Sequence, residues 1–368
     1  MSTANVDRNP ALDVLRGALL VLMTMTHLPT IWTGRFDQPF GFISAAEGFV
    51  FLSAFLAGSI IGRYQEQRGH SAAIQWVLGR AWRIYLFHLV LLAFAFTVVA
   101  WAAETFQRPA VRGLLDFYLS DPRKAAVSAA ALIYQPPLLD IFPMYVSFLL
   151  LTVPLLLVAR GAGWIPIVLV SMGVWLAAQF GLRRMFYDYL DPVLDWSIPY
   201  SALGAFDLFA WQFLWVLGLW LGTGGLTQTR RAIAQHSLVL NLGLLISSGL
   251  LIWRHWQGPM GFADMTTHLF WIDKWTLSPV RVINLLALCC VLLSIKPEWF
   301  HHRRFRPLQQ LGQSSLWAFS VHLLSVLLLL LLIDNPEQPF EGINGLLVLL
   351  VGYAVLFGAS AMHRQWKA

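Results

Sequence analysis

An arginine and a histidine interrupt an otherwise apolar stretch near the start of the chain, residues 12–29. Arg16 and His27 are eleven positions apart, which at about 100° per residue is only about 20° beyond three full turns of helix. A helix would therefore carry both side chains on one face, separated by about 16 Å along its axis. Because a charged group inside a bilayer costs at least a few kcal/mol unless it meets protein or water, this stripe predicts an internal polar cavity.

The two residue types indicate two kinds of chemistry. The planar guanidinium of Arg16 suits a phosphate or a carboxylate, because it can bind two oxygens at once. The imidazole of His27 suits proton transfer, because it changes protonation near neutral pH. Together they fit the transfer of an acyl group from a cytosolic thioester to a hydroxyl on the other side of the membrane. The competing interpretation is that Arg16 extends to lipid phosphates and His27 only bonds a neighbouring carbonyl.

Carboxylate and guanidinium groups begin the next two apolar stretches. Glu47 needs a partner if it is buried, and we expect His27 rather than Arg16, because Glu47 is placed toward the outer side. The alternative is a charge at a helix N-terminus that faces water. Arg80 and Arg83 are expected to bind nucleotide phosphates, although the excess of arginine on cytoplasmic surfaces explains them equally well.

Further polar residues lie in or beside the apolar stretches. His88 follows Arg80 by roughly two turns and is grouped with the donor-binding arginines. A histidine in the middle of a membrane segment, such as His322, is more often functional than one in a soluble core, with packing as the alternative. The expected substrate-binding residues are Asp140, Tyr145, Trp211, Gln212 and His322, and further candidates near the outer face are Asp207, Asp264 and His268.

Helices must position these residues, and the composition predicts an all-α membrane protein. The 368 residues are 58% hydrophobic and 12% charged, with a mean hydropathy of +0.63, whereas a soluble domain has about twice that charged fraction. Apolar runs of about twenty residues match the hydrocarbon thickness of a bilayer. We expect one domain, residues 1–368, forming a polytopic transmembrane helical bundle of about ten spans. The predicted spans are 11–33, 45–63, 81–103, 137–159, 164–181, 204–222, 234–253, 278–295, 311–333 and 343–362.

Basic residues predict the orientation, because lysine and arginine favour the cytoplasmic side. With both termini inside, the inner segments hold 14 of these residues and the outer segments hold 10. The prediction is therefore N-in and C-in. The first span is too long for a cleaved signal peptide and no small-residue cleavage site follows it, so we expect it to be retained.

Several classes of site and partner are excluded. No basic cluster is interleaved with exposed polar surface, so nucleic acid is not an expected partner. Cys289 and Cys290 are adjacent within an apolar run and provide neither a disulfide framework nor a metal site. No G-x-S-x-G, Walker or G-x-G-x-x-G motif occurs, and no histidine–carboxylate cluster has the spacing of metal ligands.

Two segments outside the predicted spans are long. The middle of residues 104–136 is expected to form an amphipathic helix on the outer surface. Residues 182–203 are rich in aromatic and acidic side chains and are expected to form an outward loop. Such a loop could hold a sugar-like ligand by stacking and hydrogen bonds, or could be an ordinary aromatic rim.

Small residues predict where two spans pack closely. Ala54, Gly58 and Gly62 recur at four-residue spacing in the second span, and Gly218 and Gly222 do so in the sixth. Small side chains at this spacing let helix backbones approach one another.

Arg16 and His27 form the pattern R-x10-H in the first predicted span, which resembles the hallmark of the type-three membrane acyltransferases. A more specific resemblance rests on segments that follow in order: "LDVLRG", "THLP", "FGFISAAEGFVFLSAFLAG", "RAWRIYLFHL", "LLDIFPMYV", "FAWQFLWVLGLWLG" and "LGQSSLWAFSVHLL". Together they are similar to the OpgC family over essentially the whole chain. Where members often have glycine after "FLS", this chain has Ala54, which changes only the packing.

The resemblance implies a ten-helix enzyme of the bacterial inner membrane that moves succinyl groups from cytosolic succinyl-CoA to hydroxyls of osmoregulated periplasmic glucans. His27 would be the catalytic base or an acyl relay, and Arg16 would contact CoA or position the donor. Glu47, Asp140 and His322 fall within the family's motifs. The acyl-CoA donor, the glucan acceptor and membrane lipid are the expected partners. A related cavity could carry acetyl in place of succinyl.

Two other functions remain open from the sequence. A transporter or flippase for a glycan or an acylated sugar would use the polar stripe as a conduction path, although no inverted repeat or matching pair of broken helices supports it. A scaffold for a glucan-synthesis complex would tolerate replacement of both Arg16 and His27.

Overall fold

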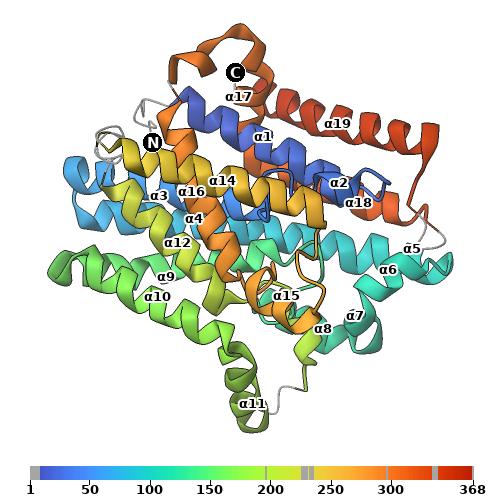
Figure 1. Ribbon diagram of the computed structural model, residues 1–368. Coiled ribbons are helices and arrows are strands. Elements are labelled where there is room, and N and C mark those ends of the chain that lie inside the picture. The colour runs from blue at the N-terminus through green and yellow to red at the C-terminus, as the bar shows by residue number, and fades with distance from the viewer. Residues whose placement is uncertain are drawn as a thin grey trace.

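The computed structural model consists of helices joined by short loops (Figure 1) and describes residues 9–194, 197–224, 231, 236–295, 297–333 and 339–366. Within these ranges the only extended pairing is a single bridge between Thr30 and Phe340. The predicted all-α class is therefore confirmed. The α-helices are α1 (Pro10–His27), α2 (Thr33–Phe36), α3 (Ala45–Arg68), α4 (His70–Phe94), α5 (Ala100–Thr105), α6 (Pro109–Leu114), α7 (Asp116–Ser120), α8 (Pro122–Ala130), α9 (Ile141–Ala162), α10 (Trp164–Gln179), α11 (Leu182–Leu194), α12 (Leu208–Thr223), α14 (Ser237–Gln257), α15 (Met265–Trp271), α16 (Pro279–Ser294), α17 (Arg306–Gln313), α18 (Ser315–Leu330) and α19 (Gly342–Gln365).

Several helices are long and apolar enough to cross a membrane, which makes this a multi-pass membrane protein. Among the described residues six helices qualify by length and composition, or up to eight if each of two bent pairs is one span. The six are Ala45–Arg68, His70–Thr105, Ile141–Ala162, Tyr200–Thr223, Ser237–Gln257 and Gly342–Gln365. The predicted number of about ten is not confirmed. Helix α16, for example, has only 16 residues, which is shorter than the roughly twenty that a bilayer span needs.

Helix α1 is shorter than the predicted span 11–33. It begins at Pro10, where the Asn9 side chain accepts a hydrogen bond from the Ala11 amide at 3.0 Å. It ends at His27, because Leu28 is extended (φ −80°, ψ 127°) and precedes a proline. His27 therefore lies at the end of the helix rather than inside it.

Helices α3 and α12 pack with their backbones in close contact. A Cβ atom on Gly222 would lie 2.2 Å from the Phe55 carbonyl oxygen, and one on Gly58 would lie 2.4 Å from that of Leu219. Only residues without a side chain permit this approach. The small-residue packing predicted for these two spans is confirmed. It fixes the position of α3 along α12.

Helix α1 is fixed by an elbow in the chain, where α17 and α18 meet at an angle of 78°. A Cβ on Gly17 would lie 2.0 Å from the Leu308 carbonyl oxygen, and one on Gly312 would lie 1.9 Å from that of Asp13. Backbone contact at two points leaves α1 little freedom to slide or rotate. The elbow therefore decides which residues of α1 face α18.

The two ends of the bundle are built differently (Figure 1). The tight α3–α4 and α9–α10 turns lie at one end, and the short helices α5 to α8 lie at the opposite end. An amphipathic helix was expected within 104–136, and α8 buries Ala125 and Ala129 while Val127 is 72% exposed. The orientation N-in and C-in stays a prediction. Four of the basic residues on which it depends, Arg8, Arg230, Lys296 and Lys367, lie outside the described residues.

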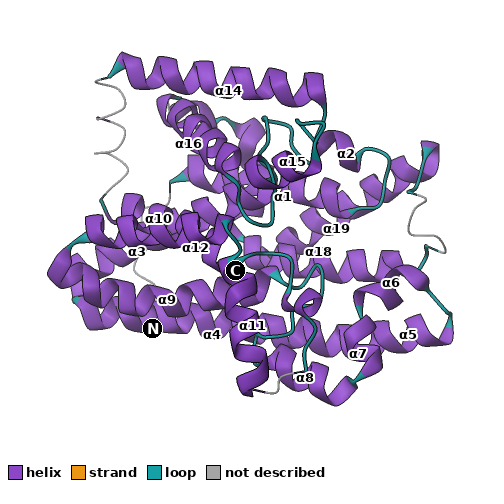
Figure 2. Cartoon of the chain, turned by 60° about the horizontal axis from the view of Figure 1, so that its bottom comes forward, coloured by secondary structure: helices purple, strands orange, loops and turns teal. Residues whose placement is uncertain are grey.

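The segment 182–203 is not the loop that the sequence predicted. Most of it forms α11, which turns from α10 at an angle of 80°. Met185 is 67% exposed and Tyr189 is 71% exposed, as suits a helix with one face toward a membrane surface. Figure 2 shows α14 at the edge of the molecule beside α16, with most of its surface uncovered.

Candidate active site

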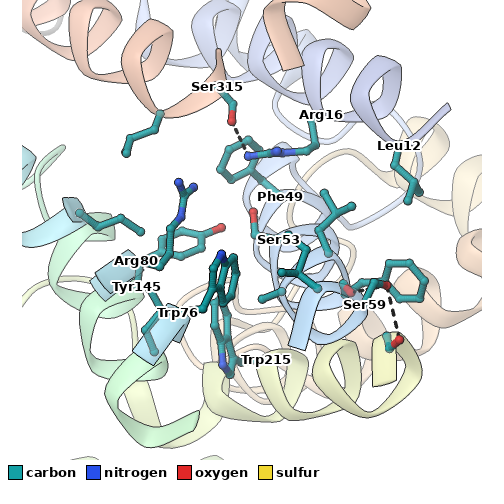
Figure 3. Close-up of a pocket in the computed structure, with 18 of the residues that line it drawn as sticks. Leu12, Arg16, Phe49, Ser53, Ser59, Trp76, Arg80, Tyr145, Trp215 and Ser315 are labelled. Carbon is teal, nitrogen blue, oxygen red and sulfur yellow. Dashed lines mark hydrogen bonds between the residues drawn. The ribbon is translucent and has the colours of Figure 1, made fainter. Parts of the chain in front are cut away.

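A cavity of about 1200 Å³ lies among α1, α3, α4, α9, α12 and the α17–α18 elbow (Figure 3). Its lining includes Asn9, Glu66 and Thr223 at helix ends, and Glu66 is exposed, so the cavity reaches the surface at the end where α3 turns into α4. The inner end is lined by Tyr145 and Phe319. The open end of the cavity, at the α3–α4 turn, is the end of the bundle that the sequence predicts to be cytoplasmic.

Arg16 enters the cavity from α1 in a defined position. Its Nη2 donates a hydrogen bond to the Ser315 hydroxyl on α18, and its guanidinium lies 5.9 Å from the centroid of the Phe49 ring. The elbow also binds Asp13, whose Oδ2 accepts a hydrogen bond from Gln313 at 3.2 Å. Both charged residues of the predicted stripe are therefore oriented by the segment that joins α17 to α18.

Arg80 enters the same cavity from α4, opposite Arg16 (Figure 3). In this view the hydroxyls of Tyr145 and Ser53 lie side by side, below the two guanidinium groups. The Tyr145 hydroxyl is buried, and its one hydrogen-bond contact among the described residues is with Ser53. Two cations and two hydroxyls that converge on one volume can bind an anion.

His27 pairs with His322. Nδ1 of His27 lies 3.2 Å from Nε2 of His322, and the rings are stacked with their centroids 5.4 Å apart and their planes at 11°. One of these two nitrogens must carry the shared hydrogen. His322 is 1% exposed, whereas His27 is partly exposed and its Nε2 makes no hydrogen bond within the described residues. The second ring nitrogen of His27 is thus available to a substrate.

Phe319 lies between the cavity and the two histidines. It lines the cavity, and its ring centroid is 6.3 Å from that of His27, 6.2 Å from that of His322 and 5.8 Å from that of Phe142. Neither histidine lines the cavity. The sequence predicted one passage joining Arg16 to His27, whereas the structure places the histidine pair outside the cavity that Arg16 lines, with the Phe319 ring between them.

The partner predicted for Glu47 is wrong. Glu47 is fully buried, and its Oε1 accepts a hydrogen bond at 2.5 Å from Arg281 on α16, rather than from His27 or Arg16. Its Oε2 accepts from the amide of Ser44 at 3.0 Å and from the hydroxyl at 2.5 Å. Ser44 and Glu47 form a capping box, a pattern that is visible in the sequence as Ser-x-x-Glu. Both carboxylate oxygens are therefore occupied.

Four other predicted site residues do not line the cavity. Trp211 is completely buried, and its indole NH donates to the Trp275 carbonyl at 3.0 Å. The Gln212 amide donates to the Ser171 carbonyl at 2.9 Å. The remaining two lie on α4: Nε2 of His88 is 3.2 Å from the Ala129 carbonyl oxygen, and Arg83 is exposed. These hydrogen bonds join separate segments of the chain, since each buried polar group finds its partner on another segment.

The acidic residues expected near the acceptor accept hydrogen bonds from backbone amides in the structure. Asp140 accepts from the Ala205 amide at 3.2 Å. Asp207 caps α12, and Asp264 caps α15, where the Thr267 amide at 2.7 Å lowers the pKa of the Asp264 carboxyl. His268 lies near them, with Nδ1 2.5 Å from the Met260 carbonyl oxygen. Among the described residues no three His, Cys, Asp or Glu side chains form a group that could hold a metal ion.

Sequence reasoning missed Ser315 and Phe319, although the spacing was present. Ser315, Phe319 and His322 are successive members of an i, i+4, i+7 series, which places them on one face of a helix. Arg16 and His27 on α1 meet the first and the last of them. The predicted common face of α1 is confirmed by these contacts, and the matching face of α18 could have been read in the same way.

Comparisons with known proteins agree with this architecture only at the level of the family. A sequence profile of the family described as OpgC protein matches residues 8–368, nearly the whole chain. A search of curated proteins returned no match, and a search of solved structures returned none either.

Proposed function

This chain belongs to the OpgC protein family, and from that premise we propose that it is a membrane O-acyltransferase. The donor is cytosolic acyl-CoA, most simply succinyl-CoA, and the acceptor is a hydroxyl of a periplasmic glucan. We place the enzyme in the bacterial inner membrane. The proposal depends on one observation: α1 and α18 pack face to face, so that Arg16 bonds to Ser315 in a basic cavity and His27 pairs with His322 farther along the same two helices.

The cavity is suited to the donor. Arg16 and Arg80 provide two cations for the phosphates of CoA, and the exposed end of the cavity lies where the donor would enter. Arg16 and His27 are separated by about 16 Å along α1, a distance that an extended pantetheine arm can span. The thioester must pass Phe319 to reach the histidines.

The histidine pair is suited to general base catalysis. In the tautomer in which His27 donates from Nδ1 to His322, Nε2 of His27 keeps its lone pair. This nitrogen takes the proton from the glucan hydroxyl as the oxygen attacks the thioester carbonyl carbon. The carbon–sulfur bond then breaks, and the thiolate recovers the proton from His27 as CoA leaves. A route in which His27 is acylated first uses the same atoms in two steps.

The acceptor side is suited to a neutral sugar. His27 is partly exposed, and Lys274 interacts electrostatically with both His27 and Asp140. Lys274 therefore lies near both of these groups, and none of the three residues lines the cavity. We assign the glucan to this group of residues.

Purified protein incubated with succinyl-CoA and periplasmic glucan tests the proposal. We expect release of free thiol and a glucan whose mass rises by succinyl groups. His27→Ala should lower the rate by at least about 100-fold, because general base catalysis contributes roughly that much or more, and its unfolding temperature in detergent should stay near that of the wild type. His255→Ala is the matched control, since His255 is exposed on α14.

Two results would overturn the proposal. Full activity in His27→Ala removes the mechanism. Movement of glucan across proteoliposomes without release of thiol favours a transporter. Parallel assays with acetyl-CoA identify the acyl group.

A further inference from the structure

The Tyr145 hydroxyl is a buried polar group that the fold holds in place and whose one hydrogen-bond contact among the described residues is with Ser53. Its ring packs edge-on against Trp215 at 5.7 Å and against Phe49 at 6.3 Å between centroids. These contacts fix the ring with its hydroxyl directed into the cavity (Figure 3). Because a hydroxyl can both donate and accept, the single contact with Ser53 leaves one of these roles open to a ligand atom in the cavity.

The surroundings of this hydroxyl specify the charge of the ligand. Arg16 and Arg80 point toward the same volume from α1 and α4, and the Ser53 hydroxyl lies beside it (Figure 3). The acidic residues of the lining are elsewhere. Asp13 is bound to Gln313 in the elbow, and Glu66 lies at the exposed end. A phenol that donates into a volume bounded by two guanidinium groups complements an anionic oxygen.

We propose that Tyr145 donates a hydrogen bond to an anionic oxygen of the acyl donor. This inference rests on the proposed function and moves Tyr145, which the sequence grouped with the acceptor, to the donor. The anion is either the diphosphate of CoA or the terminal carboxylate of a succinyl group. Both present the same chemistry to Tyr145, Arg16 and Arg80, and the choice of thioester separates them.

Tyr145→Phe tests the inference, because it keeps the ring packing and removes only the hydroxyl. With succinyl-CoA we expect KM to rise roughly tenfold, as for the loss of one charge-assisted hydrogen bond. The same rise with acetyl-CoA and none with acetyl-pantetheine identifies the diphosphate. A rise confined to succinyl-CoA identifies the carboxylate. An unchanged KM with all three donors, or the same loss with all three, overturns the inference.

Tyr134→Phe is the matched control. The Tyr134 hydroxyl is also buried, but Tyr134 does not line the cavity. We expect its kinetics to equal those of the wild type with every donor. In the absence of donor, Tyr145→Phe should unfold at a temperature close to that of the wild type, because the contact with Ser53 is the only native one that is lost. A large fall in the unfolding temperature means that the hydroxyl has a structural role and also overturns the inference.

Binding of CoA itself separates this inference from the proposed function. Calorimetry with CoA measures affinity without any transfer, and Tyr145→Phe should bind it roughly tenfold more weakly if the diphosphate is the ligand. A wild-type protein that binds CoA and transfers nothing overturns the proposed function and leaves the Tyr145 assignment standing. Equal affinity of the two proteins for CoA, together with an unchanged KM for succinyl-CoA, overturns the assignment alone.

Discussion

At the scale of the residue, the candidate chemistry depends on partners that come from another helix. Arg16 is held by Ser315, and His27 is paired with His322, so both polar side chains of α1 are oriented by α18. Glu47 also has its partner on another helix, but this pairing removes it from the candidate chemistry. Its charge is neutralised by Arg281, and a carboxylate with both oxygens occupied contributes to positioning α3 rather than to proton transfer.

His322 is expected to orient His27 by accepting its Nδ1 hydrogen. His322→Leu removes the acceptor, and we predict that kcat for succinyl transfer falls roughly 10- to 100-fold while KM for the donor changes little, as when the group that orients a functional imidazole is lost. His322→Gln places an amide oxygen near the same position and should recover part of the rate.

These two variants distinguish positioning from packing. A merely structural role for His322 would make both lose activity in proportion to the loss of folded protein. Wild-type kcat in His322→Leu would contradict the hydrogen-bond assignment. Steady-state kinetics at saturating acceptor, with an unfolding curve in detergent for each protein, decide between these outcomes.

At the scale of the element, backbone contact rather than side-chain chemistry positions the site. Helix α3 carries Phe49 and Ser53 into the cavity, and its depth is set by the glycines that let it touch α12. Helix α1 carries Arg16 and His27, and its rotation is set by Gly17 and by the α17–α18 elbow.

Gly222→Ala tests this account of helix packing. The added Cβ would lie 2.2 Å from the Phe55 carbonyl oxygen and 2.9 Å from the Ser59 amide nitrogen, so α12 must move away from α3. We expect a loss of about 1–3 kcal/mol in the free energy of unfolding, measured by denaturation in mixed micelles. Gly173→Ala in α10 is the control, because a Cβ there meets no atom within 4 Å. Equal stability of the two variants would show that the contact between α3 and α12 is more yielding than its geometry indicates.

At the scale of the whole molecule, one cavity reaches the surface at the end of the bundle that carries the α3–α4 turn. The histidine pair lies beyond Phe319, away from that opening. An enzyme that joins reactants from two compartments needs a donor entrance on one side of the membrane and reacting groups that the acceptor reaches from the other side. The proposal therefore requires the α3–α4 turn to face the cytoplasm.

Cysteine labelling tests this orientation. Gln67→Cys is exposed in the α3–α4 turn and Val127→Cys replaces a residue that is 72% exposed on α8. In cells with a permeabilised outer membrane, an impermeant maleimide should label Val127→Cys and leave Gln67→Cys unlabelled until the inner membrane is opened. The background protein carries serine in place of Cys289 and Cys290. The reverse labelling pattern would place the cavity on the wrong side for a cytosolic donor.

The sequence by itself determined the helical class, the membrane character, the common face of Arg16 and His27 and the small-residue contacts of Gly58 and Gly222. All of these follow from local composition and from the 100° step of a helix, which need no knowledge of neighbours. The family resemblance carried by ordered segments was likewise available before any coordinates, and the match over residues 8–368 confirms it.

Only the tertiary structure decided which residues meet. Glu47 pairs with a residue 234 positions away and His27 with one 295 positions away, and no local period specifies such a partner. In the structure α1 also ends at His27, and the segment predicted as a loop forms α11. Phe319 lies between Arg16 and the histidines. These outcomes depend on how helices far apart in the chain share a common interior, where each buried polar group takes the partner that packing brings within reach.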